Sequence, residues 1–149
     1  MAVPVDLGEL VRSVSSDLDV EFAAAGARVE VGVLPIVLGD VTAWARLFGR
    51  LLGDVVLRAC PDGLPVMSVK AAPHHHGLVR IRVAWEVRQP SLASRKTTRI
   101  GQSDLSVMLC RRLLRPHGGT LDLDSETGSG AAEIVAPCGQ LKPAEDAPV

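Results

Sequence analysis

Aromatic side chains are scarce in this sequence of 149 residues, which has no tyrosine, two tryptophans and two phenylalanines. A surface that stacks on exposed nucleotide bases needs several aromatic rings, so this scarcity argues against a platform for single-stranded nucleic acid. Cysteine is also rare, and Cys60, Cys110 and Cys138 are widely spaced. An odd number without a Cys-x-x-Cys pair argues against a disulfide framework or a zinc site and favours a reducing cytoplasm.

Charge of either sign is not in excess, since the formal net charge is −1. Without a strong field, nothing steers the chain toward nucleic acid or an anionic membrane. Apolar runs fall short of the ~20 residues of a membrane-spanning helix. The opening residues MAVPVDLGEL also lack the basic and then apolar blocks of a signal peptide. We therefore expect a cytoplasmic protein that binds neither nucleic acid nor membrane.

What is present is an ordinary globular composition, 47% hydrophobic and 22% charged. A first helix is predicted where Asp6 and Glu9 form a capping box, and Gly26 supplies its end. Its apolar residues recur at helical spacing: Leu7, Leu10, Val11, Val14, Leu18 and Phe22. The stretch RVEVGVLPIVLG that follows alternates and predicts one or two short strands.

The strongest periodic signal belongs to a second helix, capped by Asp40. Its apolar side chains recur every three or four residues over more than three turns: Trp44, Leu47, Phe48, Leu51, Leu52, Val55 and Val56. The turn CPDG ends this helix. Two strands follow, PVMSVKAAP and LVRIRVAWEV, joined by the turn HHHG.

The last third of the chain predicts a loop, a third helix and a closing hairpin. Residues 88–102 show no usable period and are interpreted as a loop. Ser103 or Asp104 caps the third helix, and GTLDLDS and AAEIVAP then alternate around ETGSG as two strands. The polar, proline-rich residues 140–149 are expected to be a disordered tail, after one domain of residues 1–139.

This order of elements predicts a two-layer α/β (α+β) sandwich, in which three helices cover one face of a mixed, mostly antiparallel sheet. Over residues 4–137 the chain resembles the catalytic ATP-binding domain of sensor histidine kinases, in the gyrase/Hsp90/histidine kinase/MutL ATPase superfamily. The segments that carry the resemblance are PVDLGELV, VLGDVTAWARLFGRLLGDVVLRACPDG, LVRIRVAWEV and LCRRLLRPHGGTLDLDSETGSGAAEIVAP.

The resemblance fails at the positions that handle nucleotide in that family. Where the family has the asparagine box Asn-Leu-Leu-x-Asn-Ala, this chain reads RLLGDV, with Arg50 and Asp54 in place of the asparagines. The second asparagine holds magnesium in the family, and an aspartate there keeps oxygen ligands for a metal.

Where the family has its first glycine box, Asp-x-Gly-x-Gly, the strand of this chain continues AWEVRQP. Trp85 or Glu86 falls at the adenine-binding aspartate, and an indole there would fill the adenine slot.

The second glycine box of the family, Gly-x-Gly-Leu-Gly-Leu, is replaced by QSDLSV. Its glycines let backbone amides close on phosphate at a helix N-terminus, whereas Asp104 puts a carboxylate there. With three boxes broken together, the resemblance implies a domain that binds no ATP. We expect no cofactor, no metal and no catalytic residue, and we interpret HGG and ETGSG as a helix end and a hairpin turn.

Three other features invite a site. His74, His75 and His76 are consecutive, so in an extended chain their rings alternate between faces and do not converge on one metal ion. A solvated hairpin turn is favoured. His117 falls at a helix end, where the resembled family has a structural histidine, and that role is favoured over a phosphoacceptor. Cys110 lies among apolar helix positions and is interpreted as a buried thiol.

A basic set flanks the loop that corresponds to the ATP lid of the resembled family: Arg95, Lys96, Arg99, Arg111, Arg112 and Arg115. Acidic residues concentrate instead in residues 6–40 and 122–146, and such a layout guides a partner even near zero net charge. We hypothesise that Arg95, Lys96, Arg99 and Leu105 form part of a protein interface, the alternatives being a solvated charged face and a disordered relic of the lid loop.

The favoured function is a non-catalytic protein-interaction module in bacterial two-component signalling, whose partner is a response regulator, a kinase or another signalling protein. Two alternatives stay open. One is a divergent ATP-dependent protein kinase that uses Asp54 as a metal ligand. The other is an anti-sigma-like regulator with residual nucleotide binding. The sequence sets no oligomeric state.

Overall fold

A five-stranded sheet is the centre of the molecule in the computed structural model, which describes residues 3–56, 64–88, 104–126 and 129–138. The strand order is β2-β4-β5-β7-β6. The strands span Arg28–Val31 (β2), Leu64–Pro73 (β4), Leu78–Arg88 (β5), Thr120–Glu126 (β6) and Ser129–Pro137 (β7). Strand β2 runs parallel to β4, and the other neighbours pair antiparallel. The mixed, mostly antiparallel sheet expected from the sequence is confirmed.

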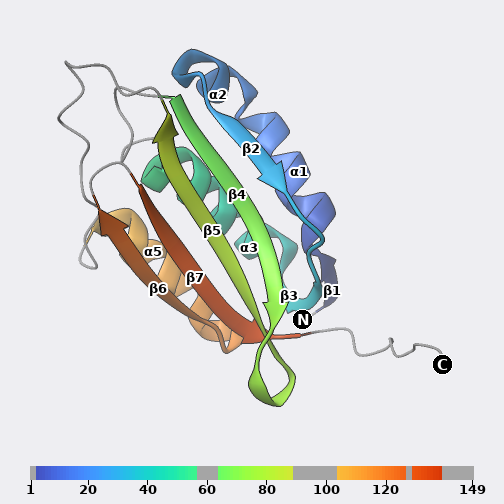
Figure 1. The fold of residues 1–149 in the computed structure, drawn as a ribbon. Helices are drawn as coiled ribbons and strands as arrows, with labels where there is room; N and C mark the ends of the chain where they lie inside the picture. The colour runs from blue at the N-terminus through green and yellow to red at the C-terminus, as the bar shows by residue number, and fades with distance from the viewer. Residues whose placement is uncertain (1–2, 57–63, 89–103, 127–128, 139–149) are drawn as a thin grey trace.

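Helices cover one face of this sheet (Figure 1). They are α1 (Leu7–Asp17), the short α2 (Asp19–Ala25), α3 (Val41–Gly49) and α5 (Leu105–Leu114). In this layer α3 lies between α1 and α5 and contacts both. The predicted two-layer α/β sandwich is therefore confirmed, with α2 as a small addition after α1.

The core lies between the two layers. On β5, every second side chain faces the helices, because side chains alternate across a strand; Ile81, Val83 and Trp85 are buried there. From the helices, Leu47 and Phe48 of α3 belong to the same buried cluster. Each such side chain contributes roughly 1.5–3 kcal/mol by leaving water, so this layer contact stabilises the fold.

Aspartates start the three main helices, as the sequence predicts. Asp6 accepts a hydrogen bond from the Glu9 amide (3.2 Å), and Asp40 accepts one from the Thr42 amide (2.9 Å). Asp104 caps α5, where its side chain accepts a hydrogen bond from the Ser106 amide (2.9 Å). Each carboxylate satisfies an amide that has no partner within its helix and favours the positive end of the helix dipole.

A second, two-stranded sheet was not predicted. Strand β1 (Val3–Asp6) pairs antiparallel with β3 (Ile36–Gly39). Four residues are too few to show an alternating pattern, and β1 is fixed by this pairing with a distant segment. The Leu7 amide extends the contact by donating to the Pro35 carbonyl (3.2 Å).

Two predicted helices differ in detail from the structure. The first ends at Asp17, because Leu18 leaves the helical conformation (φ −95°, ψ 11°), and α2 begins at the next residue. The second changes after Gly49 into a π-helical segment, η1 (Arg50–Val56), in which Leu51 and Leu52 keep their predicted places in the core. The turn CPDG, most of the loop 88–102, the centre of ETGSG and the tail 140–149 lie outside the described residues. No described helix is both long and apolar enough to cross a membrane.

Candidate functional site

The end of β5 places Trp85 and Glu86, the two residues that the sequence offers for the adenine-binding aspartate of the resembled family, on opposite faces of the sheet. Trp85 follows Ile81 and Val83 on the helix-covered face and is 3% exposed. Glu86 is exposed on the opposite face. The indole, not the carboxylate, therefore occupies the inner side of this strand end.

A glycine makes room for that indole. Gly130 of β7 lies directly across from Trp85 in the sheet. A Cβ atom at Gly130 would stand 2.4 Å from Cζ2 and 2.7 Å from Cε2 of the indole. Because real Cβ atoms do not approach so closely, the ring lies against the bare backbone of β7. The final glycine of ETGSG thus has a packing role in addition to its place beside a turn.

Asp104 occupies the N-terminus of α5. Its Oδ1 accepts a hydrogen bond from the Ser106 amide at 2.9 Å, and the Ser106 side chain is buried. An amide group at a helix N-terminus is a natural partner for an anion. Here the side chain of the protein already provides the negative charge.

The asparagine-box segment coincides with η1. Arg50 is its first residue and is half-buried. Leu51 and Leu52 are fully buried, so the segment is anchored in the core. The Asp54 side chain lies outside the described parts of the chain, and its role as a metal ligand stays a prediction.

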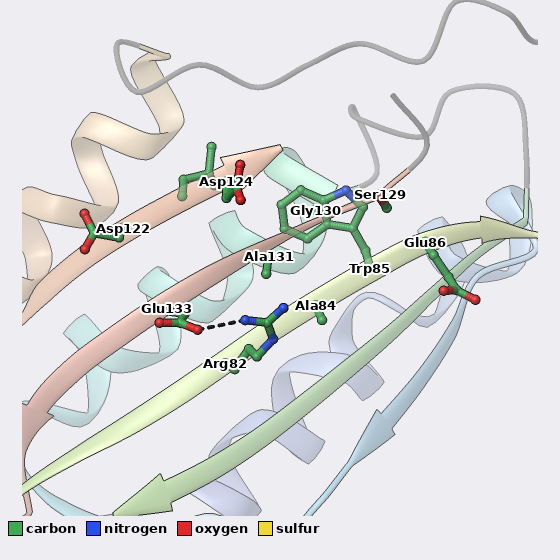
Figure 2. A pocket seen from close by; sticks show the side chains of 11 residues that line it. Arg82, Ala84, Trp85, Glu86, Asp122, Asp124, Ser129, Gly130, Ala131 and Glu133 are labelled. Atoms are coloured by element: carbon green, nitrogen blue, oxygen red, sulfur yellow. Dashed lines mark hydrogen bonds and ion pairs between the residues drawn. The ribbon is translucent and has the colours of Figure 1, made fainter. Parts of the chain in front are cut away.

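A hollow lies on the open face of the sheet, opposite the helices, with a volume of about 550 Å³ (Figure 2). Ala84 and Ala131, which pair across β5 and β7, give it small side chains. Charged groups around it are Arg82, Glu86, Asp122, Asp124 and Glu133. Sequence analysis missed this hollow, although small residues between charged ones on adjacent strands were a readable signal.

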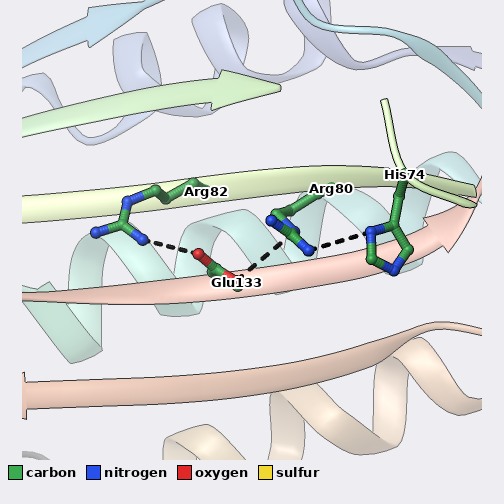
Figure 3. Close-up of polar contacts among 4 residues, drawn as sticks. All are labelled: His74, Arg80, Arg82 and Glu133. Atoms are coloured by element: carbon green, nitrogen blue, oxygen red, sulfur yellow. Dashed lines mark hydrogen bonds and ion pairs between the residues drawn. The ribbon is translucent and has the colours of Figure 1, made fainter. Parts of the chain in front are cut away.

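A chain of polar contacts leads from this hollow to the histidine turn (Figure 3). Arg82 Nη1 lies 2.7 Å from one Glu133 oxygen, and Arg80 Nε lies 3.8 Å from the other. Arg80 Nη2 is 3.1 Å from Nδ1 of His74. Since a guanidinium only donates, Nδ1 accepts and the imidazole is neutral. Partial burial, and then the Arg80 charge, lower the pKa of His74 below its ordinary 6.5.

The three histidines do not form a metal site in the part of the chain that the structure describes. They occupy the turn that joins β4 to β5, where His75 to Gly77 make a 3-10 turn and His76 adopts a positive φ of 58°. The prediction of a hairpin turn at HHHG is confirmed.

His117 links two helices. Its Nδ1 donates to the Leu113 carbonyl (2.9 Å), and its Nε2 accepts from the Asp40 amide (3.1 Å). Both ring nitrogens are therefore used in structural contacts between the end of α5 and the start of α3. Cys110 is fully buried, with Sγ 3.8 Å from the Leu47 carbonyl, as expected for a packed thiol.

No protein-family model matches the sequence, but solved structures match nearly all of it. The mycobacterial sensor histidine kinase MprB superposes with a TM-score of 0.71, covering 93% of this chain and 99% of that chain at 20% identity. A nucleotide-free catalytic domain of histidine kinase ThkA gives 0.70, covering 93% and 97% at 14% identity. The fold is that of a histidine kinase catalytic domain. The cytoplasmic segment of histidine kinase QseC gives 0.64, covering 93% and 79% at 17% identity.

The histidine kinase catalytic fold thus bears out the resemblance seen in the sequence. Of the residues singled out as vestiges, Trp85 is in the core, Asp104 caps α5 and Glu86 faces the open side of the sheet. Among the predicted interface residues, Leu105 is 69% exposed at the start of α5, beside Met108, which is 51% exposed. Arg95, Lys96 and Arg99 lie outside the described residues.

Proposed function

We propose that this chain is a non-catalytic protein-interaction module of bacterial two-component signalling, located in the cytoplasm, which has lost nucleotide binding. The histidine kinase catalytic fold supports the signalling context. The loss of nucleotide binding rests on one observation above all. The indole of Trp85 is packed on Gly130, in the core at the end of β5, where the resembled family has its adenine-binding aspartate.

The charge at the N-terminus of α5 also opposes nucleotide binding. The Asp104 carboxylate already holds the Ser106 amide at the helix N-terminus. A phosphate brought to this end would have to displace a bonded carboxylate or lie beside it, and two anions in proximity repel. The domain would therefore lack both halves of a nucleotide site, the base slot and the phosphate cradle.

Calorimetric titration with ATP and with ADP, each with magnesium, tests the proposed loss. We expect no saturable heat up to millimolar nucleotide. ShkA, whose structure was obtained with AMPPNP bound, serves as the positive control. Micromolar affinity would overturn the proposal and favour the divergent kinase or the anti-sigma-like regulator.

Partner contact is proposed at the start of α5, together with the basic residues before it. Leu105 and Met108 are large apolar side chains left in solvent, which is the usual mark of a binding surface when they adjoin one another. The candidate partners are a response regulator, a kinase or another signalling protein. The test is a pull-down from the native cell extract. It compares the proteins captured by the wild type with those captured by an Arg95→Glu, Lys96→Glu, Arg99→Glu variant. Equal capture of every partner by both proteins would contradict this surface.

A further inference from the structure

A groove on the helix layer lies between α1 and the start of α3. Its volume is about 350 Å³. Apolar groups line its length, and one of them, Val41, is half exposed. The apolar side chains are Pro4, Val5, Leu10, Val14, Val41 and Ala45.

Acidic groups accompany this apolar lining. Asp6 and Glu9 lie at one end of α1, and Asp17 lies at the other. Glu9 and Asp17 are eight residues apart, or about 12 Å along a helix. The described residues that line the groove include no lysine or arginine. The groove therefore suits an apolar helix face that carries positive charge.

Such a face exists on the same molecule. Leu105, Met108, Arg112 and Arg115 recur at spacings of three and four along α5 and its final turn, so they share one side. All four are exposed. The opposite side of α5 is buried in the core through Val107, Cys110 and Leu114. We call the four exposed residues the α5 stripe.

We propose that the α5 stripe docks in the α1/α3 groove of a second copy of this chain. This deepens the proposed function, on which it rests, by naming a partner for the surface around Leu105. Leu105 and Met108 would cover the half-exposed Val41 and the apolar lining. Arg112 and Arg115, three residues or about 4.5 Å apart along the helix, would face the acidic end of the groove, where Asp6 and Glu9 lie.

The order of the helices allows both contacts to form at once. Because α3 lies between α1 and α5 (Figure 1), a two-fold axis parallel to α3 and outside the helix layer would bring α5 of each copy over α1 of the other. The result is a closed, self-complementary dimer with two equal contacts. A short apolar groove and partly exposed charges give modest affinity, so association should depend on concentration.

Sedimentation velocity over a range of concentrations tests the dimer. We expect the wild type to pass from monomer to dimer, and a groove variant, Glu9→Lys with Asp17→Lys, to associate at least about tenfold more weakly. A stripe variant, Arg112→Glu with Arg115→Glu, should weaken equally. The control, Glu30→Lys with Asp122→Lys, makes the same charge change on the open face of the sheet and should leave association unaltered.

Mixing the two weakened variants provides the deciding measurement. In the mixture, each reversed groove meets an acidic stripe and each native groove meets a basic one, so a mixed dimer should recover to within about threefold of the wild type. Recovery would also show that both variants are folded. A wild type that stays monomeric at millimolar concentration overturns the proposal, and so does a dimer that persists in either variant.

These outcomes are separable from those of the proposed function. If the protein is monomeric and binds no nucleotide, only the proposed dimer is contradicted. If the protein binds ATP, the proposed function is contradicted, whatever its state of association.

Discussion

At the scale of single residues, Trp85 and Gly130 depend on each other. The indole fills space that any side chain at position 130 would need. The proposed loss of nucleotide binding depends on this pair, because it places an indole in the core at the strand end where the resembled family has its adenine-binding aspartate. Packing of this kind is tight, and a single added methyl group forces neighbours to shift.

Gly130→Ala should lower the free energy of unfolding by about 1–3 kcal/mol, because the new Cβ overpacks the site. The loss should shrink when Trp85 is already alanine, since the two positions are coupled. Urea unfolding of the two single variants and the double variant gives the coupling. Gly49→Ala is the matched control, because nothing lies within 4 Å of its Cβ position. Additive losses at 85 and 130 would show that the indole does not lie on Gly130.

His74 provides a test at the same scale that depends on pH. Its lowered pKa, caused by partial burial and by Arg80, means that the folded state binds its proton less readily than the unfolded chain. Stability from this residue is therefore present above about pH 6.5 and is lost as the pH falls through the folded-state pKa.

Arg80→Ala should raise the pKa of His74, because it removes both a positive neighbour and the donor to Nδ1. An NMR titration of the imidazole protons measures the change. Lys70→Ala removes a cation from the same face of the sheet, with no contact to His74 described, and serves as the control. An unchanged His74 pKa in Arg80→Ala would disprove the contact.

At the scale of elements, the α3–η1 segment holds the helix layer on the sheet. The sequence predicts the buried side of this segment correctly up to Leu52, since the spacing of three and four follows from any helical geometry. The sequence does not predict the π-helical turns, because these depend on how the segment packs against α1 and α5. The break at Leu18 and strand β1 were missed for a similar reason, as distant contacts decide both.

Leu51→Ala should lower the free energy of unfolding by about 2–5 kcal/mol, the range for a buried leucine. Leu105→Ala makes the same chemical change at a side chain that is 69% exposed, and should stay within about 0.5 kcal/mol of the wild type. Thermal or urea unfolding compares the two. Similar losses at both positions would mean that the buried side of the segment is assigned wrongly.

At the scale of the whole molecule, local signals were enough for the architecture. The caps at Asp6, Asp40 and Asp104 and the alternation of β5 are each read from a few neighbouring residues. The choice between Trp85 and Glu86 was also readable, since Trp85 continues the inward positions of Ile81 and Val83. The α1/α3 groove was not, because it exists only where segments far apart in the sequence come together.

The two outer strands of the sheet have a consequence for the behaviour of the protein in concentrated solution. An exposed strand edge invites another chain to add to the sheet and start an aggregate. Here β2 has only four residues and exposes Arg28 and Glu30, and β6 exposes Asp122 and Asp124. Arg111 further occupies the Leu121 carbonyl of β6 at 3.0 Å. Short length, charge and a side chain bonded to the edge backbone all oppose uncontrolled strand addition, so the sheet can remain open to solvent on one face without polymerising.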